Sequence, residues 1–383
     1  MMKPISTFGQ TALRNSNLRR LEGELAIANQ EVATGMKNDV AKSLGSELIN
    51  LQTIRNQFGE NESYLRSMSI YQQRWEMMDG GLAEVEDAVN RLVEIASVNG
   101  ADALDSASSV RLVAEGAVER IITGLNVQIG GRFLFGGQVV DRAPLQSIDN
   151  INPNPLSGIS PRQAIADAVA GTGPAAPLNS GVDQTVPLTI ADTEDLLDRM
   201  NGIFDGTNAA TPGLEAYSFE NTFFNGELAG LLSEIRLPGN AYETLDNQEL
   251  VDGLRDVMQG AWILASVDLE AIDDDAAYQR LMTGDADPAL GLPDRDGALD
   301  MITRGLAAIQ RTRANMGLSY QVVKASEEAT LDQNAVFNKE IIRLERADPY
   351  ETQSRFLDIE KQLEASYAAT SRVMSLNLWN FIR

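Results

Sequence analysis

The sequence predicts a mainly α-helical protein, an elongated antiparallel helical bundle or coiled coil formed by the N- and C-terminal segments, with an inserted β-rich domain. Three observations predict it. Apolar residues recur every three or four positions at both ends, aromatic residues are only 6% of 383, and seven of 13 prolines lie between 144 and 187. A core with few rings is aliphatic, which favours helices, whereas clustered prolines disfavour them.

The terminal segments carry the clearest helical ladders. A helix is predicted over 5–33, with Gly35 as its C-cap and a polar connector over 36–43. Its ladder comprises Leu18, Leu21, Leu25, Ala28 and Val32. A second ladder follows Pro349 and comprises Phe356, Ile359, Leu363, Tyr367, Thr370, Met374, Leu378 and Phe381. Such narrow stripes bury themselves against another helix, so we expect the ends to pair with each other or with partner chains. We predict that the residues of these two ladders form the assembly interface, with the exception of Ala28 and Thr370.

Longer helices are predicted inside the terminal ones. Helical periodicity covers 44–99, 107–129, 250–271 and 299–344. Polar residues at seam positions, which typically set helix register, are Arg55, Glu62, Arg313, Glu327 and Asn334. The expected organisation is terminal assembly helices at 1–43 and 350–383, a helical body at 44–145 and 247–349, and an inserted β-rich outer domain at 146–246.

The inserted segment is where strands are expected. The sequence predicts strands at Val186–Ile190 and Phe219–Phe224, and a short helix near 193–204. Before it, Gly131–Gly137 is expected to form a short strand and turn whose phenylalanines anchor the body. Proline-rich loops are tolerated on outer surfaces, so we expect that a short linker could replace 146–246 without unfolding the helices.

Charge is distributed unevenly along the chain. The formal net charge is −24, but residues 1–43 carry six basic and four acidic residues and residues 350–383 carry four of each. Near-neutral ends suit association between copies, and an acidic body suits solubility. No basic stripe is available to neutralise phosphates, so nucleic acid is not an expected partner.

Residue types exclude several kinds of chemistry. The chain has no Cys and no His, which excludes disulfides, thiolate or imidazole metal sites and Ser-His or Cys-His nucleophiles. The acidic loop at 285–297 resembles the start of a calcium loop without its later ligands, so a solvated loop is favoured over a calcium site. No catalytic, cofactor-binding or metal residue is assigned. No cleavable signal peptide and no membrane span are expected.

Three segments carry a family resemblance. Glu31–Lys37 resembles the Thr-Gly turn after the first helix of the flagellin superfamily, although the usual Asp-Asp-Pro segment is replaced here by Asp39–Lys42. Gly131–Gly137, continuing to Leu145, resembles an element of the hook-associated proteins of that superfamily. Leu363–Val373 and Ser375–Ile382 are similar to the ending of hook–filament junction proteins, and the chain lacks the usual ending of flagellin. The resemblance covers about 1–145 and 247–383.

The resemblance implies a structural, non-enzymatic and extracellular protein of the bacterial flagellum. It further implies export through the flagellar type III channel, an export chaperone on the C-terminal helix, self-association in a ring, and two neighbours, another hook–filament junction protein and flagellin. Two alternatives stay open: a flagellin that forms the filament itself, and a secreted enzyme or adhesin with its activity in 146–246.

Overall fold

The structure is a computed structural model that describes residues 7–99, 107–151, 158–170, 188–204, 218–272, 275–286, 289, 291–292 and 294–381. It confirms the predicted mainly helical fold with a strand-containing middle region. The chain divides into two compact units, a terminal unit of residues 1–63 and 329–383 and a central unit of residues 64–328. Two long helices, α3 (Glu47–Asn99) and α10 (Ala298–Glu345), contribute residues to both units.

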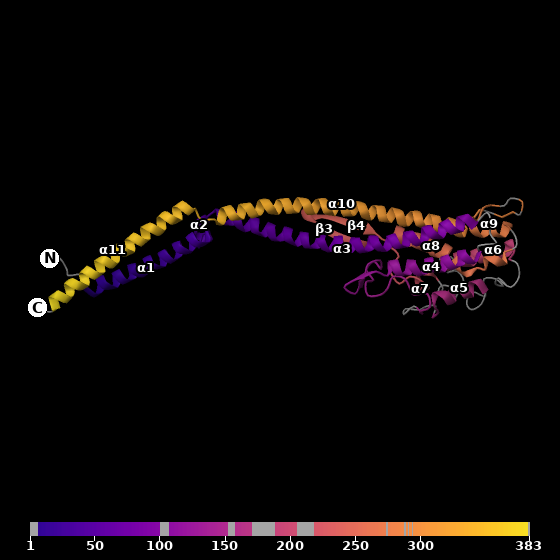
Figure 1. Cartoon of the computed structure of the whole chain (residues 1–383), viewed down its shortest axis with the longest axis horizontal. Helices are drawn as coiled ribbons and strands as arrows, with labels where there is room; N and C mark the ends of the chain where they lie inside the picture. Colours follow the sequence, from indigo (N-terminus) through magenta and orange to yellow (C-terminus); the bar gives the residue numbers. More distant parts are fainter. Residues whose placement is uncertain are drawn as a thin grey trace. The chain divides into compact units, whose positions relative to one another are not determined.

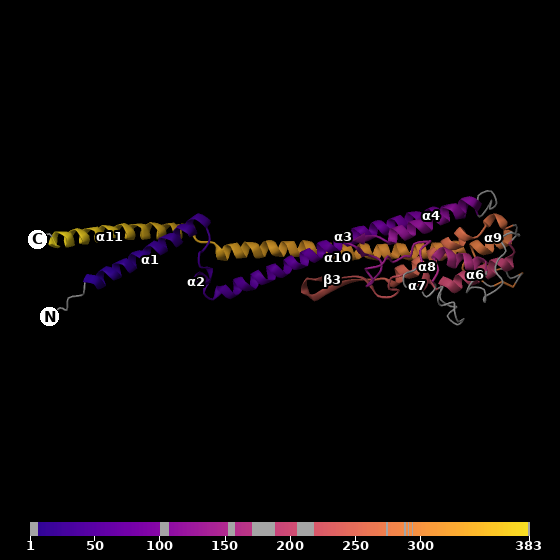
Figure 2. The same ribbon diagram turned by 90° about the horizontal axis from the view of Figure 1, so that it is seen from below.

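In the terminal unit, the first and last helices lie side by side (Figures 1 and 2). These are α1 (Thr7–Thr34) and α11 (Pro349–Phe381). Gly35 ends α1 in the left-handed region with φ 68°, where a residue without Cβ is not strained. Pro349 opens α11, where its missing N–H is not needed, and the Asp348 carboxylate accepts hydrogen bonds from the backbone N–H groups of Tyr350 and Glu351. Both helices therefore begin and end close to their predicted limits.

In the rest of the terminal unit, the start of α3 packs against the end of α10. The short helix α2 (Val40–Leu44) follows the connector and is capped by Asp39, which accepts a hydrogen bond from the Lys42 N–H. A small apolar cluster holds these parts together and consists of Leu44, Leu51, Ile54 and Leu344. The predicted seam residue Arg55 lies at its edge and forms an ion pair with Glu345 at 2.5 Å.

In the central unit, α4 (Ala107–Leu125) and α8 (Gln248–Ser266) pack together and share the largest core with α3 and α10. The helices α3 and α4 approach at two glycines, because a Cβ on Gly81 would clash with the carbonyl oxygen of Gly124 and the reverse is also true. Such a backbone contact requires glycine on both sides. The predicted helices are thus confirmed, although α4 ends four residues and α8 five residues before the expected limits.

Two predicted polar seam residues are paired across α3 and α10 within the central unit. Arg313 forms ion pairs with Asp79 at 2.6 Å and Glu86 at 2.8 Å, and the hydrogen bond to Asp79 raises the pKa of Arg313 above its ordinary value. Glu327 accepts a hydrogen bond from the Gln72 amide at 2.6 Å. These pairs join specific turns of the two helices, as expected for residues that set register.

The segment 128–137, which follows α4, contains the predicted glycine-bracketed turn. Strands β1 (Gln128–Ile129) and β2 (Arg132–Phe133) form an antiparallel pair around Gly130 and Gly131, which both have positive φ. Phe135 follows with 2% exposure in the central core. The predicted strand and turn are therefore confirmed, and Phe135 anchors them.

The described part of 146–246 contains more helix than the sequence predicts. It forms α5 (Pro161–Ala170), α6 (Ile190–Phe204) and α7 (Phe219–Thr222), and its strands form one hairpin, β3 (Leu231–Leu237) and β4 (Ala241–Asp246), joined by the turn η5 (Pro238–Asn240). The strand predicted at Phe219–Phe224 is wrong. Phe219, Phe223 and Phe224 are all buried there. The rings of Phe219 and Phe223 pack with Phe204 of α6, and the ring of Phe223 also packs with Trp262 of α8. Of the strand predicted at Val186–Ile190, residues 186–187 lie outside the described residues.

The inserted segment also shares its core with the helical body. Side chains from α5, α6 and α7 belong to the same apolar cluster as those of α4 and α8. The helix α9 (Asp275–Met282), which follows the turn η6 (Leu269–Ala271), packs against α6. The hairpin lies on α3 and α10, where Ile235 and Leu237 contact Met68, Tyr71 and Val323. The aromatic and aliphatic side chains of the described part of the insertion therefore contribute to the body's core. The division of the chain into a helical body and an outer domain at 146–246 stays a prediction.

Candidate assembly interface

The seam between α1 and α11 brings together most of the predicted interface residues whose side chains are described. Leu21, Ala28, Ile359 and Leu363 are buried in one cluster, and Leu18, Leu25 and Phe356 are partly buried against it. Hydrophobic burial of this kind stabilises a helix pair by about 25 cal/mol per Å² of apolar surface removed from water. Within this chain, the first and last helices therefore form an intramolecular pair.

Two predicted residues lie outside this seam. Val32 is 49% exposed and Tyr367 is 51% exposed. At the end of α1 the buried residue is Glu31, with 7% exposure. Its carboxylate can be buried because it has polar partners there. The side chains of Met374, Leu378 and Phe381 lie outside the described residues. The role of all these residues in binding another chain stays a prediction.

An ion pair that the sequence analysis missed closes the end of the seam. The Arg355 guanidinium on α11 pairs with the Glu31 carboxylate on α1, and the other carboxylate oxygen accepts a hydrogen bond from the Asn38 N–H at 2.9 Å. A buried charge is tolerated only when it is paired and hydrogen-bonded. The sequence contained a signal for this ion pair, because a glutamate lies in the last turn of the first ladder and an arginine lies in the first turns of the second ladder.

The connector after α1 is tied to the end of α10 by backbone hydrogen bonds. Met36 pairs with Arg346 in an antiparallel bridge, the Lys37 N–H donates to the Glu345 carbonyl at 2.8 Å, and the Ala347 N–H donates to the Gly35 carbonyl at 3.0 Å. The Lys37 Nζ also donates to the Leu344 carbonyl at 3.0 Å. The Thr-Gly turn thereby fixes where α1 leaves the rest of the terminal unit.

A groove of about 480 Å³ runs along one side of the α1–α11 pair. Its apolar lining includes Leu25, Phe356 and Leu363, and its acidic lining consists of Glu22, Glu360 and Glu364. The Tyr367 Oη donates a hydrogen bond to Glu22 Oε1 at 2.7 Å across this side, and that bond raises the pKa of the Tyr367 hydroxyl. The helix pair thus buries an apolar seam and also has a groove with acidic side chains on its surface.

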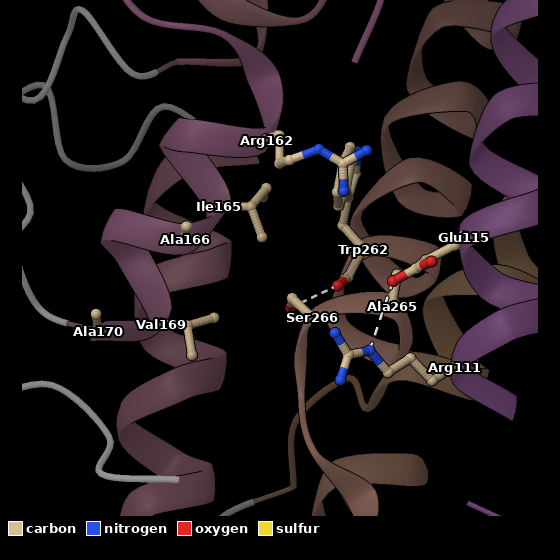
Figure 3. A pocket seen from close by; sticks show the side chains of 10 residues that line it. All are labelled: Arg111, Glu115, Arg162, Ile165, Ala166, Val169, Ala170, Trp262, Ala265 and Ser266. Atoms are coloured by element: carbon tan, nitrogen blue, oxygen red, sulfur yellow. Dashed lines mark hydrogen bonds and ion pairs between the residues drawn. The ribbon is translucent and has the colours of Figure 1, made fainter. Parts of the chain in front are cut away.

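A second cavity, of about 410 Å³, lies in the central unit between α4, α5 and α8 (Figure 3). Its walls include Ile165, Val169 and Trp262. Arg111 at its edge is paired with Glu115 at 3.5 Å, and Arg162 is paired with Asp149 at 2.6 Å, which raises the pKa of Arg162. Among the described residues that line this cavity, Glu115 is the one carboxylate, and the pair of acids that glycosidase chemistry uses is not seen there.

Ion pairs between carboxylates and arginines join the acidic loop to α6 and to α10. Asp296 pairs with Arg304 at 2.5 Å, and Arg295 from the same loop pairs with Glu194 of α6 at 3.0 Å and with Asp198. In the part of the loop that the structure describes, no three metal-ligating side chains gather as a cation site would require. Residues 273, 274, 287, 288, 290 and 293 lie outside that part.

Comparison with known proteins agrees with this geometry. The bacterial flagellin N-terminal helical region matches residues 5–139, and the bacterial flagellin C-terminal helical region matches residues 299–382, together more than half of the chain. The matched regions contain both partners of the terminal helix pair. No curated protein is found to match the chain. Over the described residues, none of the helices is both long and apolar enough to cross a membrane.

These matches identify a class of exported flagellar proteins that share their N-terminal and C-terminal helical regions. The chain belongs to the flagellin superfamily and is a structural protein of the bacterial flagellum.

Proposed function

We propose that this chain is a structural adaptor of the hook-associated protein three type, which joins the flagellar hook to the filament. The observation that carries an assembly role is the pairing of α1 with α11, whose seam uses residues from both matched regions. The terminal segments are nearly neutral although the whole chain has a formal charge of −24. Copies can therefore approach at these ends with little repulsion.

The C-terminal sequence favours a junction adaptor over a filament subunit. Leu363–Val373 and Ser375–Ile382 are similar to the ending of junction proteins, and the usual ending of flagellin is missing. An adaptor of this type has another hook–filament junction protein on one side and flagellin on the other. An export chaperone would shield its C-terminal helix before export, which would take place without a cleaved signal peptide.

Immunogold labelling of intact flagella tests this proposal. We expect gold only at the junction between hook and filament, and the chain as a trace component of sheared filaments. Cells that lack the gene should assemble hooks and release flagellin into the medium, and the wild-type gene should restore filaments. Labelling along the whole filament would make the chain a flagellin instead. Labelling away from the flagellum with normal motility would favour a secreted enzyme or adhesin.

A further inference from the structure

We infer that the cavity between α4, α5 and α8 binds a small monocarboxylate with an apolar chain. The described residues that line this cavity all belong to the central unit. The inference therefore goes beyond the proposed function, which rests on the terminal helices. The cavity has a volume of about 410 Å³, which is within the range of sites that bind small molecules.

The walls of the cavity are apolar and are held in place by the core. Ile165, Val169 and Trp262 line the cavity, although each of them is at most 5% exposed. All three belong to the main apolar cluster, which also contains residues of α4 and α8. Such walls favour the transfer of an apolar chain out of water, and side chains that are already packed do not have to be ordered when a ligand binds. This part of the site therefore accounts for the apolar chain of the ligand.

Two arginines at the edge of the cavity supply positive charge (Figure 3). The Nε of Arg162 on α5 pairs with Asp149 at 2.6 Å, and the Nε of Arg111 on α4 pairs with Glu115 at 3.5 Å. A guanidinium has five N–H donors, so the terminal Nη groups of both arginines remain for a further acceptor. Both side chains are 52% exposed, and they can therefore turn toward a ligand without disturbing the core.

The charge of the lining favours a ligand with one carboxylate group. Among the described residues that line the cavity, the charged ones are Arg111, Arg162 and Glu115, with a net formal charge of +1 in a chain of net charge −24. One carboxylate would neutralise this charge, whereas a second carboxylate would meet Glu115. We expect Arg162 to be the main partner of the ligand, because its own acidic partner Asp149 is not among the lining residues. A guanidinium can bind a carboxylate through two parallel hydrogen bonds.

The indole of Trp262 offers a further hydrogen-bond donor. Its Nε1 is buried and has no hydrogen-bond partner among the described residues. An indole N–H can only donate, and a buried donor without an acceptor is unfavourable. A ligand oxygen that contacts Trp262 would provide this acceptor. A ligand held by α4, α5 and α8 together would also stabilise the central unit, because it binds the folded state and not the unfolded chain.

Calorimetric titration of the full-length chain tests the site with hexanoate at pH 7, where the carboxyl group is ionised. We expect hexanoate to bind with a Kd of about 1 mM or lower. Its binding should be at least tenfold tighter than that of hexanamide, which lacks the charge, and of acetate, which lacks the apolar chain. Equal binding of hexanoate and hexanamide, or no binding of hexanoate, overturns the inference. Binding of acetylglycylleucine at least tenfold more tightly than hexanoate also overturns it, in favour of the carboxylate end of a protein.

Three variants of the full-length chain locate the binding. Arg162→Gln removes the expected partner of the carboxylate, and Ala166→Leu places a larger side chain on the exposed edge of the cavity. Each should weaken hexanoate binding at least tenfold. The matched control is Arg120→Gln, because Arg120 is an exposed arginine of α4 that is paired with Glu84 and is not among the lining residues. Unchanged binding by Arg162→Gln or by Ala166→Leu overturns the inference, and so does an equal loss in the control.

The indole N–H signals in a proton–nitrogen correlation spectrum provide the second readout. The chain has three Trp, and the variant Trp262→Phe assigns the signal of Trp262. Hexanoate should move this signal downfield, because the N–H gains a charged acceptor. The signal of Trp75 should stay in place, since its Nε1 already donates to the Met316 carbonyl at 2.9 Å. A Trp262 signal that does not move at saturating hexanoate overturns the inference. These measurements do not involve flagellar assembly, so this site and the proposed adaptor can fail independently.

Discussion

The carboxylate of Glu31 on α1 is paired with the guanidinium of Arg355 on α11, 324 residues later in the chain. The Glu31 side chain is 8% exposed and the Arg355 side chain is 48% exposed. The pair is therefore asymmetric, since water can solvate the arginine but not the carboxylate. Removing the arginine should be worse than removing the acid, because it leaves a buried charge without its partner.

We predict that Arg355→Met opens the terminal helix pair more often than Glu31→Gln does. The expected loss is about 3–5 kcal/mol for a buried charge left without its partner, confined to α1 and α11. Amide hydrogen exchange of residues 20–35 measures it. The exposed pair Arg20–Glu24 offers the control, and Glu24→Gln should leave exchange nearly unchanged, as surface pairs contribute little. Equal exchange in the two variants would contradict the asymmetry.

The apolar seam supports a second prediction. Leu363→Asp should prevent incorporation into flagella, because Leu363 is 6% exposed and an ionised carboxylate there costs several kcal/mol. The main melting transition of the central unit, followed by circular dichroism, should shift little, since its core residues form a separate cluster. The exposed neighbour Ala369 gives the control Ala369→Asp. A shift of tens of degrees for Leu363→Asp would show that the termini belong to the main core.

The inserted segment now supports a prediction opposite to the one from sequence. Phe223 is 1% exposed, and its ring lies 6.5 Å from that of Trp262 on α8. Phe223→Ala should destabilise the central unit by about 3–5 kcal/mol, and replacing 146–246 by a linker should reduce the helicity of the body. Urea denaturation followed by tryptophan fluorescence measures the first effect, with Tyr242→Ala on the exposed side of the hairpin as control. Unchanged stability of the Phe223→Ala variant would instead support the prediction that 146–246 is a separate domain.

The glycine contact between α3 and α4 can be tested with one substitution and its control. Gly124→Ala should destabilise the central unit, because its Cβ would meet the carbonyl oxygen of Gly81. Gly116→Ala, eight positions earlier on α4, meets nothing within 4 Å and should stabilise the helix by up to about 1 kcal/mol. Opposite shifts in melting temperature are expected. Shifts of the same sign would mean that the helices do not approach at Gly124.

Alkaline pH should loosen the contact between the β3–β4 hairpin and α3. Burial raises the pKa of the Tyr71 hydroxyl, the Glu243 carboxylate adds to the rise, and a hydrogen bond with Ser319 opposes it. Because the folded-state pKa is above the unfolded value near 10, the stabilisation is complete below about pH 10 and is lost as the pH rises through the folded-state pKa. Tyr71→Phe should therefore lose less stability above pH 10 than the wild type, measured by urea denaturation. Parallel loss would contradict the assignment.

Local patterns in the sequence were sufficient for the long helices and for most of the terminal seam. Leu21, Ala28, Ile359 and Leu363 were predicted from spacing because every turn of a paired helix needs an apolar residue on the same side. The helical state of Phe219–Thr222 could not be predicted in this way. Clustered phenylalanines suit either a strand or a helix, and the choice depends on Phe204 and Trp262, which are distant in the sequence.

The connector has a consequence for the order of folding. Gly35 and Lys37 form backbone hydrogen bonds with residues 347 and 345, and among the described residues α1 packs mainly against the last helix of the chain. A ribosome completes the first helix long before it makes these partners. Nucleating an unpartnered helix is unfavourable in water, so α1 must wait until synthesis has nearly ended. The newly made N-terminus therefore stays available to other proteins for almost the whole time of translation.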